Sequence, residues 1–390
     1  MRVLYITGEF PPMRGSIGDH TARLATAVMA QGHEVGVLTA TEAREAKLPG
    51  AEIFPLVEQW NLASWRTIGE AARGYDVLHL EYQAGAFGMG LAPQLMADAT
   101  RLFTGGKPFV TTFHDLLVPY LFPKAGRARG WSVRHLARAS DGVVVTNEED
   151  AEALRQQGVA RLWQVPIASP LPLDPGPDFD REAWREAWNV GPQHKLLVHF
   201  GFINRAKGVE TLLRAYDGLL RAGQPVRLLM AGDPLGASDP SNQTYLEEIH
   251  HLAGELNLEE PWIQWTGDLS EQELIRSILA ADLIALPFRE GASLRRSTLV
   301  MSLSLGRPIV TTEPATPIPF LQNGHNIAIV RRDDSAAFAR QIALLIRYEP
   351  TLRRLERGAS ELRQHFDWGR IAEQYIEVYG AVLARREKNV

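Results

Sequence analysis

Two glycine-containing loops carry paired cations that could hold a diphosphate. Residues 201–208 read GFINRAKG and residues 287–296 read PFREGASLRR. Each loop follows an apolar run and precedes a helical pattern, so its cations and backbone N–H groups could meet one anion. Arg295 and Arg296 would stand in the first helical turn, against the helix dipole and without an acidic partner nearby, which favours an external anion. The alternative for both loops is ordinary solvated charge.

Two further loops carry residues suited to sugar hydroxyls or phosphate. Gly15 and Gly18 would let the backbone of residues 11–20 approach a ligand, but their spacing is not the GxGxxG of a dinucleotide site, which argues against a dehydrogenase. His114 ends another apolar run, where it could bond a sugar hydroxyl or share charge near a departing phosphate. The alternatives are a glycine-rich turn and a satisfied histidine at a corner that Asp115 caps.

These loops need strands that end at one edge of a sheet. Apolar runs and amphipathic stretches alternate along the first half, which predicts the strand–helix–strand units of a parallel sheet. We predict strands over residues 3–7, 34–39, 76–80, 108–112 and 141–146, and helices over 20–31, 65–73, 92–102, 130–139 and 148–157.

The second half repeats the pattern after a proline-rich break. Residues 170–180, PLPLDPGPDFD, contain four prolines and no periodicity, so we interpret them as a linker. We then predict strands over 195–200, 226–231, 262–265, 283–286 and 308–312, and helices over 208–221, 243–256, 271–280 and 294–305. The predicted fold class is α/β, with two doubly wound parallel-sheet domains that bind ligands at the carboxyl ends of their strands.

Length and composition agree with two globular domains. The chain has 390 residues, of which 45% are apolar, enough for two cores. A net charge of −5 argues against a nucleic-acid partner, and the lack of cysteine excludes disulfides and thiolate zinc sites. No apolar run reaches the length of a membrane span, and MRVLYITGEF lacks the pattern of a signal peptide, so we expect a cytoplasmic protein.

Taken in order, these loops and several short motifs resemble glycosyltransferases of the GT-B fold, specifically glycosyltransferase family 4. The resemblance runs through nearly the whole chain. Its motifs are Gly15 to His20, Gly32-His33-Glu34-Val35, Gly201 with Lys207-Gly208-Val209-Glu210 and Leu213, Ala231-Gly232-Asp233-Pro234, Thr266-Gly267-Asp268, Ala281-Asp282, Leu305-Gly306-Arg307-Pro308-Ile309-Val310, and the ending Phe366-Asp367-Trp368, Ile371-Ala372 and Tyr375 to Tyr379.

The resemblance implies two Rossmann-like domains that face each other across a cleft. Residues 1–175, with a final crossing helix at about 366–390, would form the acceptor side, and residues 185–365 would bind the nucleotide sugar. It implies transfer of a hexosyl group with retention by a front-face route, without a cofactor or bound metal. Lys and Arg side chains beside the leaving diphosphate could supply the positive charge that Mg²⁺ provides elsewhere. The partners implied are a nucleotide-sugar donor and a glycan, lipid-linked or small-molecule acceptor.

Roles for single residues follow from the same resemblance. Lys207 would hold donor phosphate, Glu290 would contact the donor sugar and His114 would lie near the transferred sugar, which makes these three the catalytic candidates. The donor candidates are Arg205, Lys207, Gly267, Asp268, Leu269, Glu290, Gly291, Ser293, Leu294, Arg295, Arg296 and Thr298, and the acceptor-side candidates are Gly15, Ser16, Asp19 and Tyr82.

Two positions depart from the family pattern. Phe202 stands where the family usually has Arg, and Thr298 stands where it usually has a second Glu that holds ribose hydroxyls. Either the donor site is degraded, or it is rebuilt. In the rebuilt site one of the nearby arginines, Arg205, Arg295 or Arg296, would replace the lost cation, and Ser297 or Thr298 would bond the ribose. We prefer the rebuilt site.

Two features stand outside the donor loops. Asp178-Phe179-Asp180 has the Asp-x-Asp spacing of metal-dependent transferases of another fold, but it lies in the linker, and we interpret it as solvated. The stretch 124–138 holds five cations, one tryptophan and no acid, so it could contact anionic lipid at the inner membrane face, line an anionic acceptor site or be a solvated helix face. The cations are Lys124, Arg127, Arg129, Arg134 and Arg138, and the tryptophan is Trp131.

Two other functions remain open. A sugar-nucleotide epimerase of the same architecture would need acid and base carboxylates, for which Glu81, Asp115 and Glu290 are available. A catalytically weak nucleotide-sugar-binding protein would account for Phe202 and Thr298. The sequence names neither the sugar, the base, the acceptor nor the oligomeric state.

Overall fold

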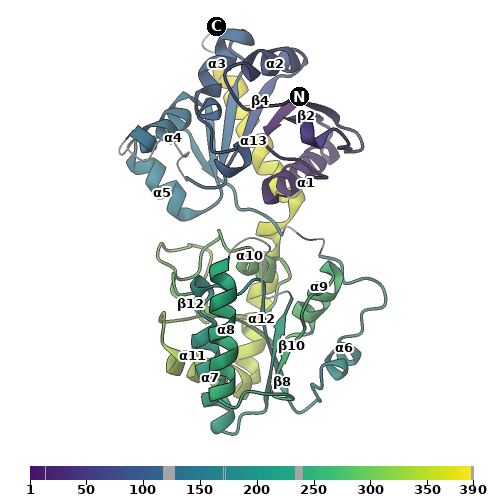
Figure 1. Cartoon of the computed structure of the whole chain (residues 1–390), viewed down its shortest axis with the longest axis vertical. Coiled ribbons are helices and arrows are strands. Elements are labelled where there is room, and N and C mark those ends of the chain that lie inside the picture. The colour runs from purple at the N-terminus through teal and green to yellow at the C-terminus, as the bar shows by residue number, and fades with distance from the viewer. Residues whose placement is uncertain (14, 117–127, 170, 172, 233–239, 388–390) are drawn as a thin grey trace. The chain divides into compact units, whose positions relative to one another are not determined.

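The chain divides into two compact units. The computed structural model describes residues 1–13, 15–116, 128–169, 171, 173–232 and 240–387, without the side chains of 128–130, 240–242 and 387. Unit 1 comprises Met1–Pro170 and Asp367–Val390, and unit 2 comprises Leu171–Phe366 (Figure 1). Arg14, Lys124, Arg127 and the Asp233-Pro234 pair of the sequence motif lie outside the described residues, as does the side chain of Arg129.

Unit 1 is built on a parallel sheet of seven strands in the order β3-β2-β1-β4-β5-β6-β7. The strands are β1 (Arg2–Thr7), β2 (Glu34–Ala40), β3 (Glu52–Val57), β4 (Val77–Tyr82), β5 (Phe109–Phe113), β6 (Gly142–Val145) and β7 (Leu162–Gln164). Their central members are buried on both faces because helices cover both sides, as parallel sheets require. Along β1, Val3 and Tyr5 point to one face, and Leu4 and Ile6 point to the other.

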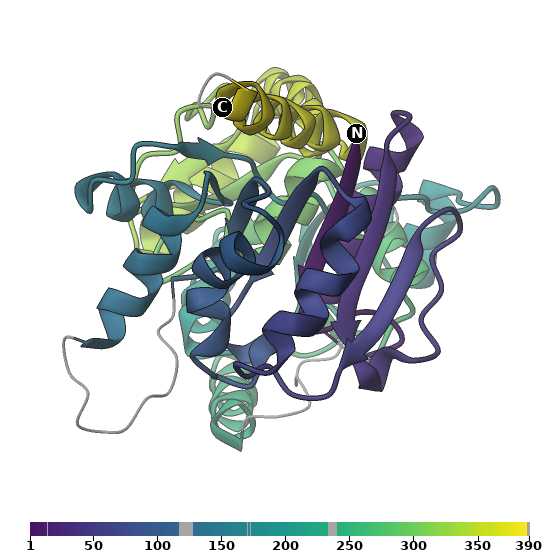
Figure 2. The same ribbon diagram turned by 90° about the horizontal axis from the view of Figure 1, so that it is seen from above.

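Helices from both ends of the chain cover one face of this sheet. α1 (Ser16–Ala30) and α13 (Trp368–Glu387) lie side by side there (Figures 1 and 2). α13 contributes apolar side chains such as Tyr375 and Tyr379 to the same core as Val3 and Tyr5. The opposite face is covered by α2 (Ser64–Ala71), α3 (Met96–Phe103), α4 (Ala128–Ala139) and α5 (Glu148–Gln156).

Unit 2 repeats the plan with a parallel sheet of six strands in the order β10-β9-β8-β11-β12-β13. The strands are β8 (Lys195–Phe200), β9 (Val226–Ala231), β10 (Ile263–Trp265), β11 (Leu283–Leu286), β12 (Ile309–Thr312) and β13 (Ala328–Val330). The helices are α6 (Arg181–Ala187), α7 (Val209–Arg221), α8 (Pro240–Glu255), α9 (Glu271–Ala280), α10 (Ser297–Ser304), α11 (Ser335–Arg347) and α12 (Glu349–Leu362), with the short 3-10 helices η5 (Arg205–Lys207) and η6 (Arg363–Phe366).

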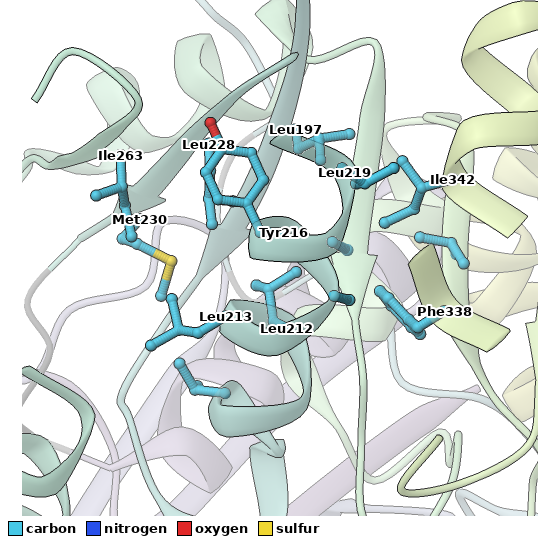
Figure 3. Packing of buried hydrophobic residues seen from close by; sticks show 14 of the residues in the cluster. Leu197, Leu212, Leu213, Tyr216, Leu219, Leu228, Met230, Ile263, Phe338 and Ile342 are labelled. Carbon is cyan, nitrogen blue, oxygen red and sulfur yellow. The ribbon is translucent and has the colours of Figure 1, made fainter. Parts of the chain in front are cut away.

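The core of unit 2 has a layer on each face of its sheet. On one face α7 packs Leu212, Tyr216 and Leu219 against strand residues such as Leu197 and against α11 (Figure 3). On the other face α9, α10 and η6 cover the alternate strand residues. Strand β8 therefore lies in a fully covered centre of the sheet, and the loop after it begins from a rigid position.

The predicted α/β fold class is confirmed, and most predicted elements lie within two residues of the observed ones. Four helix starts differ by more. α1 begins at Ser16 and α8 at Pro240, four and three residues before their predicted starts. α3 begins at Met96, four residues after its predicted start because residues 92–95 form a 3-10 helix, and α10 begins at Ser297, three residues after its own. The sequence did not predict β3, β7, β13, α6, α11 or α12. α6 follows the predicted linker directly, because the Asp180 carboxylate accepts the N–H groups of Glu182 and Ala183 and so caps that helix.

Within the described residues, no helix combines the length and the apolar character that a membrane span requires.

Candidate active site

The loop after β8 buries a lysine at the carboxyl edge of the sheet of unit 2. Lys207 closes η5, which Asn204 caps, and only 8% of its surface is exposed. Its ammonium group lies 3.2 Å from the carbonyl oxygen of Phe200, the last residue of β8. No carboxylate pairs with it among the described ion pairs. The ammonium group therefore lies at the end of the strand, and the Phe200 carbonyl is its one hydrogen-bond acceptor among the described residues.

Glycines make room for this lysine and join its loop to the next one. Gly201 has φ +84°, and a Cβ there would lie 2.7 Å from Lys207 Nζ and 2.9 Å from Thr298 Cγ2. Gly208 has φ +65°, and a Cβ there would lie 2.1 Å from the carbonyl oxygen of Pro287. Only glycine tolerates both the left-handed backbone and the contact. The loops after β8 and β11 are thus in direct contact, and the N–H of Arg289 also donates to the carbonyl of Ala206.

Burial changes the proton affinity of this lysine. Desolvation, aided by the nearby Arg296, lowers the pKa of Lys207 to about 7. His199 lies beneath it on β8, fully buried, and its pKa falls to about 4 because of desolvation and the charge of Lys207. An anion placed beside Lys207 would favour the charged form, so ligand binding and protonation are coupled here.

The structure corrects one argument from the sequence. Arg295 and Arg296 precede α10, because that helix begins at Ser297, and Arg296 pairs with Glu290. The loop folds back on itself through Gly291, which brings the carboxylate at 290 onto the guanidinium at 296. The expectation that Arg296 has no acidic partner was therefore wrong. The Glu290 side chain is 71% exposed, so it can still reach a ligand.

The remaining donor candidates lie on the same edge with different partners. Arg205 makes two hydrogen bonds to Glu248 of α8, at 2.6 and 2.8 Å, and lies over the ring of Tyr245. Ser293 is nearly buried, and its hydroxyl accepts from the N–H of Arg295 at 3.3 Å. Leu294 is buried in the core, and Gly291 approaches the carbonyl of Glu313. Gly267 has φ +67° after β10, Asp268 is exposed, and Leu269 packs against the core.

The two unusual positions of the donor side differ in exposure. Phe202 is 53% exposed, beside the buried lysine loop. Thr298 is 5% exposed, stands in the first turn of α10 and contacts the region of Gly201, yet its hydroxyl has no hydrogen-bond partner among the described residues. Buried hydroxyls are normally hydrogen-bonded, so this one is available to a ligand or an ordered water.

In unit 1 a carboxylate of the protein itself occupies the N-terminus of α1, where the sequence suggests that an anionic ligand could bind. Gly15 is the N-cap of α1, and the carboxylate of Glu9 accepts the N–H groups of Ile17 at 3.0 Å and Gly18 at 3.4 Å. A Cβ on Gly15 would lie 2.0 Å from the Glu9 carboxylate. Glycine at 15 therefore serves this internal cap. Ser16 and Asp19 are exposed beside it.

His114 belongs to a buried polar cluster at the carboxyl ends of β4 and β5. Its Nε2 lies 2.7 Å from the carboxylate of Glu81, which is fully buried. The ring of His20, from α1, meets the ring of His114 edge-on at 4.8 Å. Burial lowers the pKa of both histidines to about 4. Both rings are neutral at pH 7, and Nε2–H of His114 donates to Glu81, which leaves a lone pair on Nδ1.

Several atoms of this cluster have no partner. Among the described residues, nothing bonds His114 Nδ1, either nitrogen of His20, or the second oxygen of Glu81. That oxygen lies 3.6 Å from Nε2 of His79, whose own bonds go to Tyr379 and Thr112. The cluster is thus anchored to α13 on one side and unsatisfied on the other. Such buried groups are typical of sites that complete their bonds with a ligand.

Tyr82 lies deeper than the other acceptor-side candidates. Its side chain is fully buried and its hydroxyl lies 2.6 Å from the side-chain amide of Gln94. Burial raises the pKa of Tyr82 well above its usual range. The residue supports the sheet and offers no exposed surface to a ligand.

One group among the described residues has the composition of a metal site. One ligand atom each from His20, Glu81 and His114 lies within 4.8 Å of the others. Ligands that bind zinc at about 2.1 Å cannot lie more than about 4.3 Å apart across the ion, so these side chains would have to move inward. The geometry fits the observed hydrogen bond better than a preformed metal site.

Three functional candidates escaped the sequence. His20 was named only as the end of the Gly15 to His20 motif and the start of a predicted helix, without a chemical role, and Glu9 and Glu248 drew no attention. The signal for Glu9 lay in its spacing: an acid some seven residues before a helix can fold back onto its N-terminus, but many loop acids have such spacing without doing so. No local pattern indicates that His20 meets His114, because α1 and β5 are brought together only by the sheet order.

The comparisons with known proteins cover both units. Residues 15–168 match the family model described as glycosyl transferase 4-like domain, and residues 180–362 match the model described as glycosyl transferases group 1. The chain belongs to the glycosyltransferases, in a family 4-like group with the GT-B fold.

Individual relatives are distant. The chain is 25% identical to a D-inositol 3-phosphate glycosyltransferase of Nocardia farcinica over 79% of this chain and 67% of that protein. It is 24% identical to a phosphatidyl-myo-inositol mannosyltransferase of Mycobacterium leprae over 96% and 95% of the two chains. The solved structure of Anabaena HepE in complex with UDP has a TM-score of 0.74 at 18% identity, covering 98% of this chain and 100% of that one. These likenesses confirm the fold and the general class of enzyme.

Proposed function

We propose that this glycosyltransferase moves a hexosyl group from a nucleotide-diphosphate sugar to a hydroxyl group of an acceptor, with retention of anomeric configuration and without a metal ion. The observation that carries the proposal is the buried Lys207 at the carboxyl edge of unit 2, with a pKa near 7 and no carboxylate partner among the described residues. A buried ammonium group is costly unless an anion neutralises it. A donor diphosphate is the anion that the family would bring to such an edge.

The reaction needs charge stabilisation on the leaving group. The bond between the anomeric carbon and the phosphate oxygen breaks, and the acceptor oxygen forms its bond to that carbon on the same face. The acceptor proton passes to the departing phosphate oxygen. Lys207 would stabilise the developing negative charge, the task that a metal ion performs in other transferases.

The residues around Lys207 support a rebuilt rather than a degraded donor site. The unpartnered hydroxyl of Thr298 is placed to accept or donate to a ribose hydroxyl in place of the usual carboxylate. Arg296 lies close enough to Lys207 to lower its pKa, so it adds positive potential to the same place. Glu290 and Ser293 would contact the donor sugar and phosphate.

In unit 1, His114 is the candidate to contact the transferred sugar. Its Nε2–H is held by Glu81, so its Nδ1 presents a lone pair. That atom would accept a hydrogen bond from a sugar hydroxyl and fix the ring for attack. The histidine would thereby act by orientation, since its low pKa disfavours a role as proton donor at neutral pH.

Solved structures and relatives suggest where to begin with substrates. The Anabaena HepE structures contain UDP in one case and UDP-glucose in another, and the names of the two relatives given above include inositol 3-phosphate and phosphatidyl-myo-inositol. A first panel would therefore pair UDP-, GDP- and ADP-hexoses with myo-inositol phosphate, phosphatidylinositol and simple sugars.

The test follows release of nucleoside diphosphate and the new glycoside over this panel, with EDTA present. Release that depends on both donor and acceptor, persists in EDTA and falls at least a hundredfold in Lys207→Met would support the proposal. Strict dependence on Mn²⁺ would overturn the metal-independent mechanism, and an inverted anomer would overturn retention. Epimer formation without diphosphate release would favour the epimerase, and binding without either product would favour the binding protein.

A further inference from the structure

A second cluster of cations lines a cavity at the other edge of the sheet of unit 1. The cavity of about 430 Å³ lies where β5, β6 and β7 begin, whereas His114 lies where β5 ends. It is lined by Arg101, Gly106, Pro108, Asp141, Arg161, Val382, Arg385 and Arg386. Pro108, Asp141 and Arg161 each immediately precede a strand, α3 supplies Arg101, and α13 supplies the last three. The chemistry proposed above makes no use of this cavity.

One carboxylate serves several donors at the cavity wall. Asp141 accepts the N–H of Phe109 at 3.0 Å through one oxygen. Its other oxygen lies 3.4 Å from Arg161 and 3.9 Å from Arg101. Arg101 also approaches Asp98 at 3.7 Å, and that carboxylate is held by His135 at 2.6 Å. Arg101 also donates to the backbone carbonyl of Ala139, and Arg161 donates to that of Asp141 at 3.3 Å. Each guanidinium group thus has a backbone acceptor, but among the described ion pairs neither has a carboxylate closer than 3.4 Å.

The two arginines of α13 have even fewer acidic contacts. Arg386 donates to the backbone carbonyl of Gly105 at 2.6 Å, and the neighbouring Gly106 has φ +75°, which lets the loop come within reach of that side chain. Arg385 is exposed and makes no ion pair or hydrogen bond with the described side chains. The cavity thus gathers four guanidinium groups against two carboxylates, one of them at its margin.

We propose that this cavity binds a phosphate-bearing anion, at a site separate from the donor site. Guanidinium groups match phosphate oxygens in pairs, and a cavity of this size fits a diphosphate or a phosphate on a small alcohol. Like charges held together in a half-enclosed space repel one another unless an anion is added. A solvated basic surface would not need the three loops before β5, β6 and β7 and the end of α13 to converge around one cavity.

The phosphate could come from a soluble molecule or from a lipid headgroup. Leu102 and Phe103, which follow Arg101 on α3, are 82% and 52% exposed. Exposed apolar side chains beside arginines suit a lipid surface, and a soluble phosphate would need neither of them. The shared chemistry is the phosphate group, and the experiment separates its two sources.

The first arm titrates the full-length chain with inorganic pyrophosphate by calorimetry and maps the site by hydrogen–deuterium exchange. We expect protection of peptides from residues 98–108 and 380–386. Arg385→Gln and Arg161→Gln should each weaken this binding by about ten- to a hundredfold. Arg66→Gln is the matched control, since Arg66 is an exposed arginine of the same unit that pairs with Glu70 and does not line the cavity. Repeating the titration in Lys207→Met separates this site from pyrophosphate bound in unit 2.

The second arm measures flotation with vesicles of phosphatidylcholine, with and without anionic phosphatidylglycerol. Pyrophosphate binding that is localised to the cavity and lost in Arg385→Gln supports a soluble ligand. Flotation only with anionic vesicles, lost in Arg385→Gln and in Leu102→Ser but retained in Arg66→Gln, supports a headgroup. If pyrophosphate and vesicles both fail to bind, or if they bind equally well to the Arg385 and Arg161 variants, the proposal is wrong. Thermal melting of each variant shows whether it is folded.

Discussion

Lys207 carries its charge where charge is costly, and this gives the enzyme a characteristic pH dependence. Desolvation lowers the pKa of the free side chain to about 7, so the cation is present below that pH and lost above it. We expect kcat/KM for the donor to fall as pH rises through 7, by about tenfold per unit at high pH, because that ratio reports the free enzyme. Initial rates from pH 6 to 9 at low donor concentration measure the fall.

Arginine at the same position is the control for this profile. In Lys207→Arg the guanidinium remains protonated throughout the range, so the alkaline fall should vanish even if the larger side chain lowers the absolute rate. A fall that persists unchanged in this variant would assign it to another group.

Glu81 is predicted to act through His114. In Glu81→Gln the amide can donate to Nε2, which would move the ring proton to Nδ1 and remove the lone pair that a sugar hydroxyl would use. We expect kcat to fall about a hundredfold, with a smaller change in donor KM. The control is Glu52→Gln, which alters a carboxylate on β3 that accepts a hydrogen bond from the Tyr75 hydroxyl. This variant should leave kcat near its original value. Equal losses in both variants, or a lower melting temperature that accounts for the loss, would remove the positioning role.

At this scale the sequence reveals residues that carry a local pattern and misses those that depend on a distant partner. Lys207 lies in a loop with a recognisable order of glycine, cation and helix, and His114 ends an apolar run. The link between Arg296 and Glu290 depends on a turn at Gly291, and the approach of His20 to His114 depends on the strand order. Such contacts arise from tertiary structure, so spacing alone does not predict them.

Among the elements, the joined loops after β8 and β11 depend on Gly208. Alanine there would combine a left-handed backbone with a Cβ 2.1 Å from the carbonyl oxygen of Pro287. We expect Gly208→Ala to lower the free energy of unfolding of unit 2 by about 3 kcal/mol, the sum of backbone strain and overpacking. Urea unfolding measures the change.

Gly223 offers a matched control within the same unit. Its φ is +67°, almost the same as at Gly208, but a Cβ there would meet no atom within 4 Å. Gly223→Ala should therefore lose only the backbone contribution, about 1 kcal/mol. Equal losses at the two positions would mean that the contact with Pro287 does not constrain the loop.

Elements with a strong period were predictable, and elements at the margins were not. β8, β9, β11 and α9 agree with the prediction residue by residue, because each is a mainly apolar run or a clear amphipathic stretch. β3 contains Pro55 and is mostly half-exposed at the edge of its sheet, so it lacks the apolar signal of a central strand. The early start of α1 was hidden by Gly15 and Gly18, which are common in loops, and is stabilised by Glu9 from outside the helix.

Considering the whole molecule, buried neutral histidines make unit 1 the more acid-sensitive of the two. His20, His79 and His114 in unit 1 and His199 in unit 2 have pKa values lowered to about 4, mainly by desolvation. Below pH 6.5 these histidines bind protons in the unfolded chain but stay neutral in the folded one. The free energy of unfolding therefore falls as pH falls toward 4. Each histidine contributes a slope of at most about 1.4 kcal/mol per pH unit.

Calorimetry between pH 7 and 5 tests this difference. We expect the transition of unit 1 to move to lower temperature more steeply than that of unit 2, and Gly208→Ala identifies the latter by lowering it alone. His20→Gln should make the transition temperature of unit 1 depend less steeply on pH. Parallel slopes for the two transitions would contradict the assignment of the excess protons to the cluster around Glu81.

The position of α13 has a consequence for how the protein is made. Its Tyr375 and Tyr379 complete the core of unit 1, yet the ribosome adds them only after all of unit 2 has been synthesised. Until then the part of the sheet face that α13 covers beside α1 stays exposed in the nascent unit 1, and chaperones have that interval in which to bind it. A stalled nascent chain ending before Trp368 should therefore show a protease-sensitive first half beside a resistant second half.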